Sequence, residues 1–252
     1  MPWNPDQYNK FQTQRSAPFD DLLNLILVRP GLNAVDLGCG TGELTEKLAS
    51  FLPDSNVIGY DNSQEMLDKA VARKRPGLNF VHGDQAELPG NWNLIFSNAA
   101  LQWSENHAQL IPFLYEKLDF GGQITIQVPS NHTHVSHKLI FQTAQQEPFK
   151  SALNNYVRIS PVLTIEQYAQ LFFNLGAENI IVFEKVYCHV LNNSDEVVEW
   201  VSGTALVPYF ERLGTQKLDF LEEIRRKFRD SMPDIPLFYP FKRILISAQK
   251  PR

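Results

Sequence analysis

The sequence contains little cysteine, no long apolar run and no excess of basic residues. Two cysteines in 252 residues, Cys39 and Cys188, form neither a disulfide framework nor a metal-binding pair. No stretch approaches the ~18 apolar residues of a membrane span. The first residues, MPWNPDQYNKF, lack the apolar core of a signal peptide. We therefore expect a reduced, cytoplasmic protein with no membrane partner.

The charge balance is acidic, with 23 basic and 28 acidic residues and a net charge of −5. This balance argues against a nucleic-acid partner bound through phosphate neutralisation.

His132, His134 and His137 have no carboxylate or cysteine beside them, so we expect solvated loop histidines and no metal. With 43% hydrophobic residues, the chain can bury the core of one large domain, or of one domain with a cap. We expect a monomer.

Short apolar segments alternate with helical patterns in the first half of the chain. Strands are expected at 34–37, 56–60, 78–81, 92–96 and 123–128, and helices at 43–51, after Ser63 and at 107–118. This alternation predicts βαβ units and a mostly parallel sheet.

The pattern changes after Pro129. Residues 131–160 are polar and irregular, 164–175 are helical, 179–190 form a strand, 194–232 are helical with Ser194 and Thr215 as caps, and 241–248 form a last strand. We expect a sheet domain in which the insertions 131–160 and 194–236 lie near one another over one edge.

The most informative segment is Val35–Gly42, which reads VDLGCGTG between a strand and a helix. Glycines here allow positive φ and close approach of a ligand to the backbone. The spacing is G-x-G-x-G, and Glu43 stands where the dinucleotide fingerprint has its third glycine, so a pyrophosphate would be repelled. No Gly-Lys-Ser/Thr follows, which excludes a P-loop. The segment therefore predicts a nucleoside-like ligand without phosphates, or else a tight turn with no ligand.

Polar residues follow the next three strands. Asp61, 23 residues after Gly38, is placed to accept from both ribose hydroxyls or to cap the next helix. Asp84 is placed to accept from an adenine amino group or to stabilise an ordinary turn. Asn98 ends the fourth strand. These positions are carboxyl ends of strands, where ligands bind in open α/β sheets.

This pattern resembles that of class I S-adenosylmethionine-dependent methyltransferases. The matching motifs are Val35–Gly42, Gly59–Asn62, Gly83–Gln85, Leu94–Asn98 and Gly121–Val128. The resemblance implies an α/β, Rossmann-like fold: a seven-stranded, mostly parallel sheet with helices on both faces. It implies S-adenosylmethionine as cofactor. Gly38, Gly40 and Gly42 would lie under its methionine part, with Asp36 orienting their turn and Asn98 along the methionine. Asp61 would bind the ribose, Asp84 and Gln85 would lie near the adenine, and Asn62 is a further cofactor-binding candidate.

A second resemblance extends over nearly the whole chain, to the trans-aconitate 2-methyltransferase family. It rests on Trp3-Asn4-Pro5, Tyr8, Phe11, Arg15-Ser16, Asn98–Trp103 with His107, Gln127–Asn131 and Glu199–Thr204; malonyl-carrier-protein methyltransferases carry a stretch related to Asn98–Trp103. It implies that residues 1–30 form a flap over the cofactor, with Arg15 near the cofactor carboxylate. Residues 31–130 would then form the cofactor-binding core, 131–160 and 194–236 a helical cap, and 161–193 and 237–252 the rest of the sheet.

The chain departs from this family at Val207, where the family's cap commonly has an arginine. A valine cannot clamp a carboxylate, so we expect an acceptor that is less charged and more hydrophobic than a tricarboxylate. Arg158, Lys242 and Arg243 are the remaining candidate cations. Trp103 and Trp200 either line the acceptor pocket or pack in the core.

A carboxylate is ionised at pH 7 and needs no general base to accept a methyl group. The sequence accordingly favours methyl transfer to a carboxylate oxygen of a small organic acid. The alternatives are an acyl group on a carrier protein or another small-molecule acceptor, and for an amine or a hydroxyl the first candidate base is His107. A non-catalytic cofactor-binding module is a further alternative, against which the intact Asp36, glycines and Asp61 argue.

Overall fold

The computed structural model describes the backbone of residues 12–252 and the side chains of residues 17–252. The chain forms two compact units. The first, called here the sheet unit, comprises residues 17–129, 161–185 and 243–252. The second, called the helical unit, has its described side chains in residues 130–160 and 186–242. No helix in the described part of the chain is both long and apolar enough to cross a membrane.

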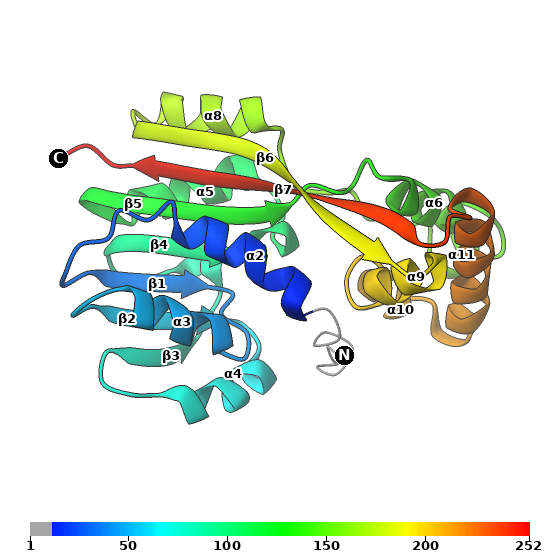
Figure 1. Ribbon diagram of the computed structural model, residues 1–252, viewed down its shortest axis with the longest axis horizontal. Helices are drawn as coiled ribbons and strands as arrows, with labels where there is room; N and C mark the ends of the chain where they lie inside the picture. The colour runs from blue at the N-terminus through cyan, green and yellow to red at the C-terminus, as the bar shows by residue number, and fades with distance from the viewer. Residues whose placement is uncertain (1–11) are drawn as a thin grey trace. The chain divides into compact units, whose positions relative to one another are not determined.

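Seven strands form one sheet in the order β3-β2-β1-β4-β5-β7-β6 (Figure 1). Their bounds are β1 Asn33–Leu37, β2 Asn56–Asp61, β3 Leu78–His82, β4 Trp92–Asn98, β5 Leu118–Pro129, β6 Glu178–Leu191 and β7 Leu237–Gln249. Strands β1 to β5 pair in parallel, and β7 runs antiparallel to β5. The predicted seven-stranded, mostly parallel sheet is confirmed.

Helices cover both faces of this sheet. They are α2 Gln12–Leu23, α3 Glu43–Phe51, α4 Gln64–Ala70, α5 His107–Glu116 and α8 Ile165–Asn174, with short 3-10 turns η1 Val71–Arg73, η2 Gln85–Glu87 and η3 Leu101–Trp103. Alternation along β4 divides the core: Leu94 and Phe96 pack with residues of α2, α3 and α4, whereas Ile95 packs with residues of α5 and α8. Each such fully buried side chain contributes about 1.5–3 kcal/mol of hydrophobic free energy.

The helical unit contains α6 Val135–Ala144, α7 Phe149–Ala152, α9 Ser194–Ser202, α10 Val207–Phe210, η4 Gly214–Gln216 and α11 Lys217–Ser231. Its core includes Phe220, Ile224 and Phe228, a stripe of α11 that packs against Val197 and Val201 of α9. The expectation that 131–160 is irregular was wrong, because α6 and α7 lie within it.

Two predicted helix caps were also wrong. The cap of α9 is Asn193 rather than Ser194, because the Asn193 Oδ1 accepts from the backbone N–H groups of Asp195 and Glu196 at 3.0 and 3.4 Å. Thr215 lies inside η4, from which α11 continues directly. Ser63 does cap α4, as predicted, by accepting from the N–H of Met66.

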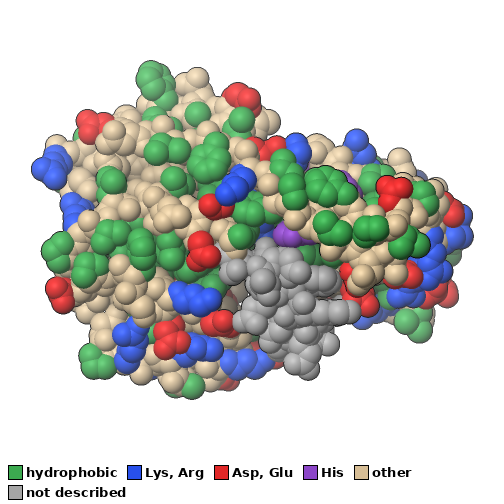
Figure 2. Space-filling view, in the orientation of Figure 1, with side chains coloured by type: hydrophobic (Ala, Val, Ile, Leu, Met, Phe, Trp, Pro, Cys, Tyr) green, Lys and Arg blue, Asp and Glu red, His purple; other side chains and the backbone are tan. Residues whose placement is uncertain are grey.

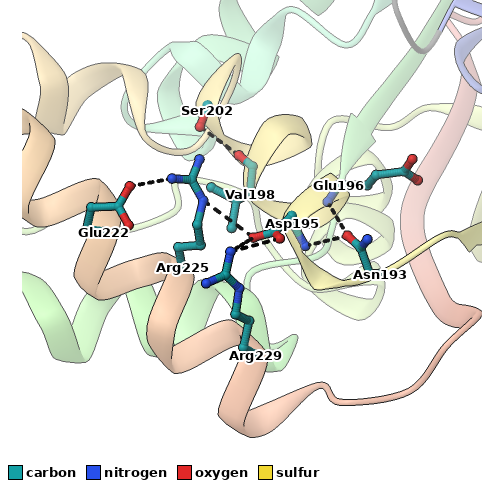
Figure 3. A network of polar contacts seen from close by, with 8 residues as sticks. All are labelled: Asn193, Asp195, Glu196, Val198, Ser202, Glu222, Arg225 and Arg229. Carbon is teal, nitrogen blue, oxygen red and sulfur yellow. Dashed lines mark hydrogen bonds and ion pairs between the residues drawn. The ribbon is translucent and has the colours of Figure 1, made fainter.

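Ion pairs join α9 to α11 (Figure 3). Asp195 accepts from Arg229 Nη2 at 3.0 and 3.1 Å and lies 3.4 Å from Arg225 Nε, and Glu222 also binds Arg225. The basic cluster of α11 is therefore neutralised by acidic residues of the same unit, and Lys, Arg, Asp and Glu side chains intermingle on this part of the surface (Figure 2). Because these side chains are partly exposed, each pair contributes about 1 kcal/mol or less.

The histidines of 132–137 are not all solvated, contrary to expectation. His134 caps α6, its Nδ1 accepting from the N–H of Ser136, and packs edge-on against Tyr239 at 4.9 Å between ring centroids. Burial lowers the pKa of His134 and His137, so both are neutral at pH 7. Among the residues that the structure describes, no three His, Cys, Asp or Glu side chains gather as a metal site.

Candidate functional site

The turn between β1 and α3 is built by three glycines with left-handed backbone. Gly38, Gly40 and Gly42 have φ of 73°, 55° and 75°. A Cβ on Gly38 would lie 2.2 Å from the Cβ of Ala100, and one on Gly42 would lie 2.6 Å from the Phe80 ring. A Cβ on Gly40 would meet no heavy atom of the described residues within 4 Å. Packing thus requires Gly38 and Gly42, whereas no described residue crowds the backbone of Gly40, as in a ligand-binding turn.

Asp61, at the end of β2, holds this turn. Its Oδ2 accepts from the Gly40 N–H at 2.8 Å, and its Oδ1 accepts from the Ser63 N–H at 2.8 Å. The carboxylate is half-buried, and it keeps lone pairs for a further donor such as a ribose hydroxyl. Asp61 is not the cap of α4, since Ser63 has that role.

Asp36 lies beneath the turn and is almost fully buried. Its Oδ2 accepts from the hydroxyl of Thr45 in α3 at 2.6 Å, which ties β1 to the helix after the turn. Burial raises the pKa of Asp36 to about 7, and the charge of Asp61 adds to this effect. Thr45 was not among the predicted site residues, because no spacing rule links a strand aspartate to it.

The adenine and ribose candidates lie at the ends of β2 and β3. Asp84 is exposed and caps η2 by accepting from the Ala86 N–H at 2.8 Å. Gln85 donates through its Nε2 to the Ser104 hydroxyl. Asn62 has an exposed side chain, and its backbone carbonyl accepts from His82 Nε2 at 3.1 Å. Their contacts with a nucleoside stay predictions.

Asn98, the last residue of β4, has one buried polar atom without a hydrogen-bond partner among the described residues. Its Oδ1 is buried and has no hydrogen-bond partner among the residues that the structure describes. A buried acceptor without a donor costs about 1–3 kcal/mol. Asn98 therefore fits a ligand that brings an N–H or O–H group to this edge of the sheet.

His107 does not fit the role of general base. Its ring is buried, and Nε2 donates to the Leu101 carbonyl at 2.8 Å. Nδ1 then accepts from the hydroxyl of Tyr168 at 2.5 Å. Burial also lowers the pKa of His107. Because both ring nitrogens are hydrogen-bonded inside the core, His107 has a structural role, and the prediction of His107 as a base is wrong.

The five acceptor candidates are spread over both units. In the sheet unit, Trp103 is exposed at the end of η3, and Arg243 is buried with a hydrogen bond to Gln127. In the helical unit, Trp200 is 3% exposed among aromatic rings, which favours core packing for it. Val207 begins α10 and is half-buried, and Lys242 donates through its backbone N–H to Asn131.

Two cationic candidates remain. Arg158 belongs to the helical unit, where burial lowers the pKa of its guanidinium and its backbone N–H donates to the Tyr209 hydroxyl at 3.0 Å. The side chain of Arg15 lies outside the described residues, as does segment 1–11 of the predicted flap 1–30.

Cys39 lies in the glycine turn. Burial raises the pKa of its thiol, so Cys39 does not act as a nucleophile.

The glycine turn, Asp61 and the sheet order together define a class I S-adenosylmethionine-dependent methyltransferase. A family described as "Methyltransferase domain" matches residues 29–175. Trans-aconitate 2-methyltransferase of Deinococcus radiodurans is 45% identical over 100% of this chain and 99% of its own length. The enzyme of the same name from Variovorax paradoxus is 35% identical over 99% of both chains. The chain belongs to the trans-aconitate 2-methyltransferase family.

Solved structures agree at the level of fold. A methyltransferase from Bacillus halodurans superposes with a TM-score of 0.59 at 16% identity, over 94% of this chain and all of that one. Phosphoethanolamine N-methyltransferase 2 of Haemonchus contortus, in complex with S-adenosyl-L-methionine, gives 0.57 at 18% identity, over 94% of this chain and 53% of that one. S-adenosylmethionine is the cofactor that membership of this methyltransferase family indicates.

Proposed function

We propose that this methyltransferase transfers the methyl group of S-adenosylmethionine to a carboxylate oxygen of a small organic acid of the trans-aconitate class. The observation that favours a carboxylate acceptor is the hydrogen bonding of His107. An amine or hydroxyl acceptor needs a base. His107, the base that the sequence suggests, has both ring nitrogens hydrogen-bonded, one to Leu101 and one to Tyr168. A carboxylate is already ionised and needs none.

The residues present fit the cofactor. The uncrowded backbone at Gly40, the carboxylate of Asp61 and the unpartnered Oδ1 of Asn98 suit a nucleoside that lacks phosphates and has an ammonium-bearing tail. When bound, the cofactor supplies a methyl group that its sulfonium already activates. The protein then contributes by holding the two reactants in line and excluding water, an effect worth up to ~7–11 kcal/mol.

The test uses cofactor carrying a labelled methyl group, with trans-aconitate as acceptor. We expect labelled product from which mild alkali releases methanol, because carboxyl esters are base-labile. Amine and ether products keep their label under the same treatment. An alkali-stable product, or label found on a carrier protein instead of the acid, would refute the proposal.

Val207 leads to a finer proposal about the acid. An apolar residue at this position favours an acceptor with fewer charges than a tricarboxylate, since a buried unpaired carboxylate is costly. Rates on trans-aconitate should therefore be compared with rates on a monocarboxylate of similar length. Efficient turnover of trans-aconitate that Val207→Arg leaves unchanged would show that this position does not select the substrate.

A further inference from the structure

Strand β5 has a polar face inside the sheet unit. Its side chains alternate between two kinds, the apolar Ile124, Ile126 and Val128 and the polar Gln123, Thr125 and Gln127, all of them buried. The polar set faces the side of α2, which includes Leu245, and the apolar set faces that of α5 and α8. Polar residues in the buried middle of a sheet need hydrogen-bond partners.

Gln123, near the amino end of β5, has its partners in the protein. Its Nε2 donates to the Leu25 carbonyl at 2.7 Å and lies 2.8 Å from the Ser247 hydroxyl, and its Oε1 accepts from the Leu27 N–H at 2.9 Å. This glutamine is fully explained by folding, because it fastens the segment after α2 to the sheet.

Gln127, at the carboxyl end, differs from Gln123. Its side chain has no exposed surface, and its Oε1 accepts from Arg243 Nη1 of β7 at 3.0 Å. Its Nε2 has no hydrogen-bond partner among the residues that the structure describes. The bond to Arg243 fixes which end of the amide faces the arginine, so the donor end is left for another group. The described residues do not account for this donor.

Asn98 is the register partner of Gln127 across β4 and β5, so the two side chains lie on the same face of the sheet. Its Oδ1 also has no hydrogen-bond partner among the described residues. The site is continuous with the glycine turn, because Ala100 stands where a Cβ on Gly38 would lie. An N–H donor, a guanidinium and an amide acceptor thus lie beside the cofactor-binding turn.

We propose that Gln127 and Arg243 bind a carboxylate of the methyl acceptor. The inference rests on the proposed function, to which it adds a subsite. A carboxylate accepts from an amide N–H and a guanidinium together. The Oδ1 of Asn98 would repel a carboxylate, so this atom takes the ammonium of the cofactor instead. Asn98 and Gln127 thereby bind different ligands, which are selected by their charge.

The test variant is Gln127→Glu in the full-length protein. It keeps an oxygen for Arg243 but replaces the free N–H donor with a negative oxygen. We expect the KM for trans-aconitate to rise about 10- to 100-fold, as loss of a charge-assisted hydrogen bond predicts, with a smaller change in kcat. Calorimetry should show the same increase in the Kd of trans-aconitate for the S-adenosylhomocysteine complex. Arg243→Lys keeps the charge but loses the planar fork, so its KM should rise less.

The matched control is Gln249→Glu, which makes the same charge change at the opposite edge of the sheet, where Gln249 accepts from Asn179. It should leave KM, kcat and both affinities unchanged. Gln127→Glu protein that binds and methylates trans-aconitate like wild type would overturn the subsite. If wild type binds the acid through Gln127 but forms no ester, only the proposed function fails. Wild-type protein that does neither would overturn both.

Discussion

The carboxylate of Asp61 accepts a hydrogen bond from the backbone N–H of Gly40 over 2.8 Å, across 21 residues of sequence. The acidic end of β2 and the glycine turn after β1 are therefore one structure. Asp61 fixes the conformation of this turn. We propose that the same carboxylate also binds the ribose of the cofactor, which would give one side chain two roles.

Replacing Asp61 tests this double role. We expect Asp61→Ala to weaken S-adenosylhomocysteine binding by about 1.5–3 kcal/mol, the value of a hydrogen bond to a charged group. Asp61→Asn keeps an acceptor for Gly40 and should lose less. Calorimetry measures the affinity, and circular dichroism checks that the fold remains. Unchanged binding in Asp61→Ala would leave the carboxylate with a purely structural role.

Two glycines of the same turn should respond differently to alanine. At Gly42 a methyl group would clash with Phe80, so Gly42→Ala should destabilise the protein by about 1–3 kcal/mol through overpacking, besides the strain of a positive φ. At Gly40 there is space, so Gly40→Ala should cost only about 1 kcal/mol of backbone strain and should mainly weaken cofactor binding. Urea unfolding and calorimetry on both variants separate the effects. Equal stability losses would contradict the difference in packing between the two positions.

Asp36 should make stability depend on pH. Because burial raises its folded-state pKa from 3.8 to about 7, the folded state holds a proton that the unfolded state releases between these values. Its contribution is therefore fully present below pH 4 and is lost as the pH rises to 7. The Asp36→Asn variant has no carboxyl group at this position, so its stability lacks this loss with rising pH. The free energy of unfolding of the variant, minus that of wild type, should increase from pH 5 to pH 8 by a few kcal/mol at most. A difference that does not vary with pH would contradict the buried carboxyl.

His107 and Tyr168 should matter for stability and not for the chemical step. We expect His107→Gln and Tyr168→Phe each to lower the free energy of unfolding by about 1–3 kcal/mol, since each leaves a buried polar partner unsatisfied. The double variant should lose less than the sum, because the two residues share one hydrogen bond. For folded enzyme, kcat should change little and its pH profile should show no histidine titration. A large fall in kcat at unchanged stability would restore His107 as a base.

The order of the elements and the glycine turn follow from local sequence. Apolar segments bounded by glycine predict the strands of the first half, and the G-x-G-x-G spacing with Glu43 is by itself enough to disfavour a dinucleotide. Asp61 is found by its position at the end of a strand. These features are local because strand ends and turns are specified by residues close together in the chain.

Pairings between distant residues were decided by the tertiary structure. Arg243 and Gln127 are 116 residues apart, and His107 and Tyr168 are 61 apart. Their contact depends on the insertion of β7 beside β5 and on the docking of α8 near α5, which no local pattern encodes. The sequence itself predicted a methyl-donor cofactor at the ends of β1, β2 and β4. Only the fold, by bringing distant side chains into the same buried layer, decided which of their polar atoms have hydrogen-bond partners among the described residues and which do not.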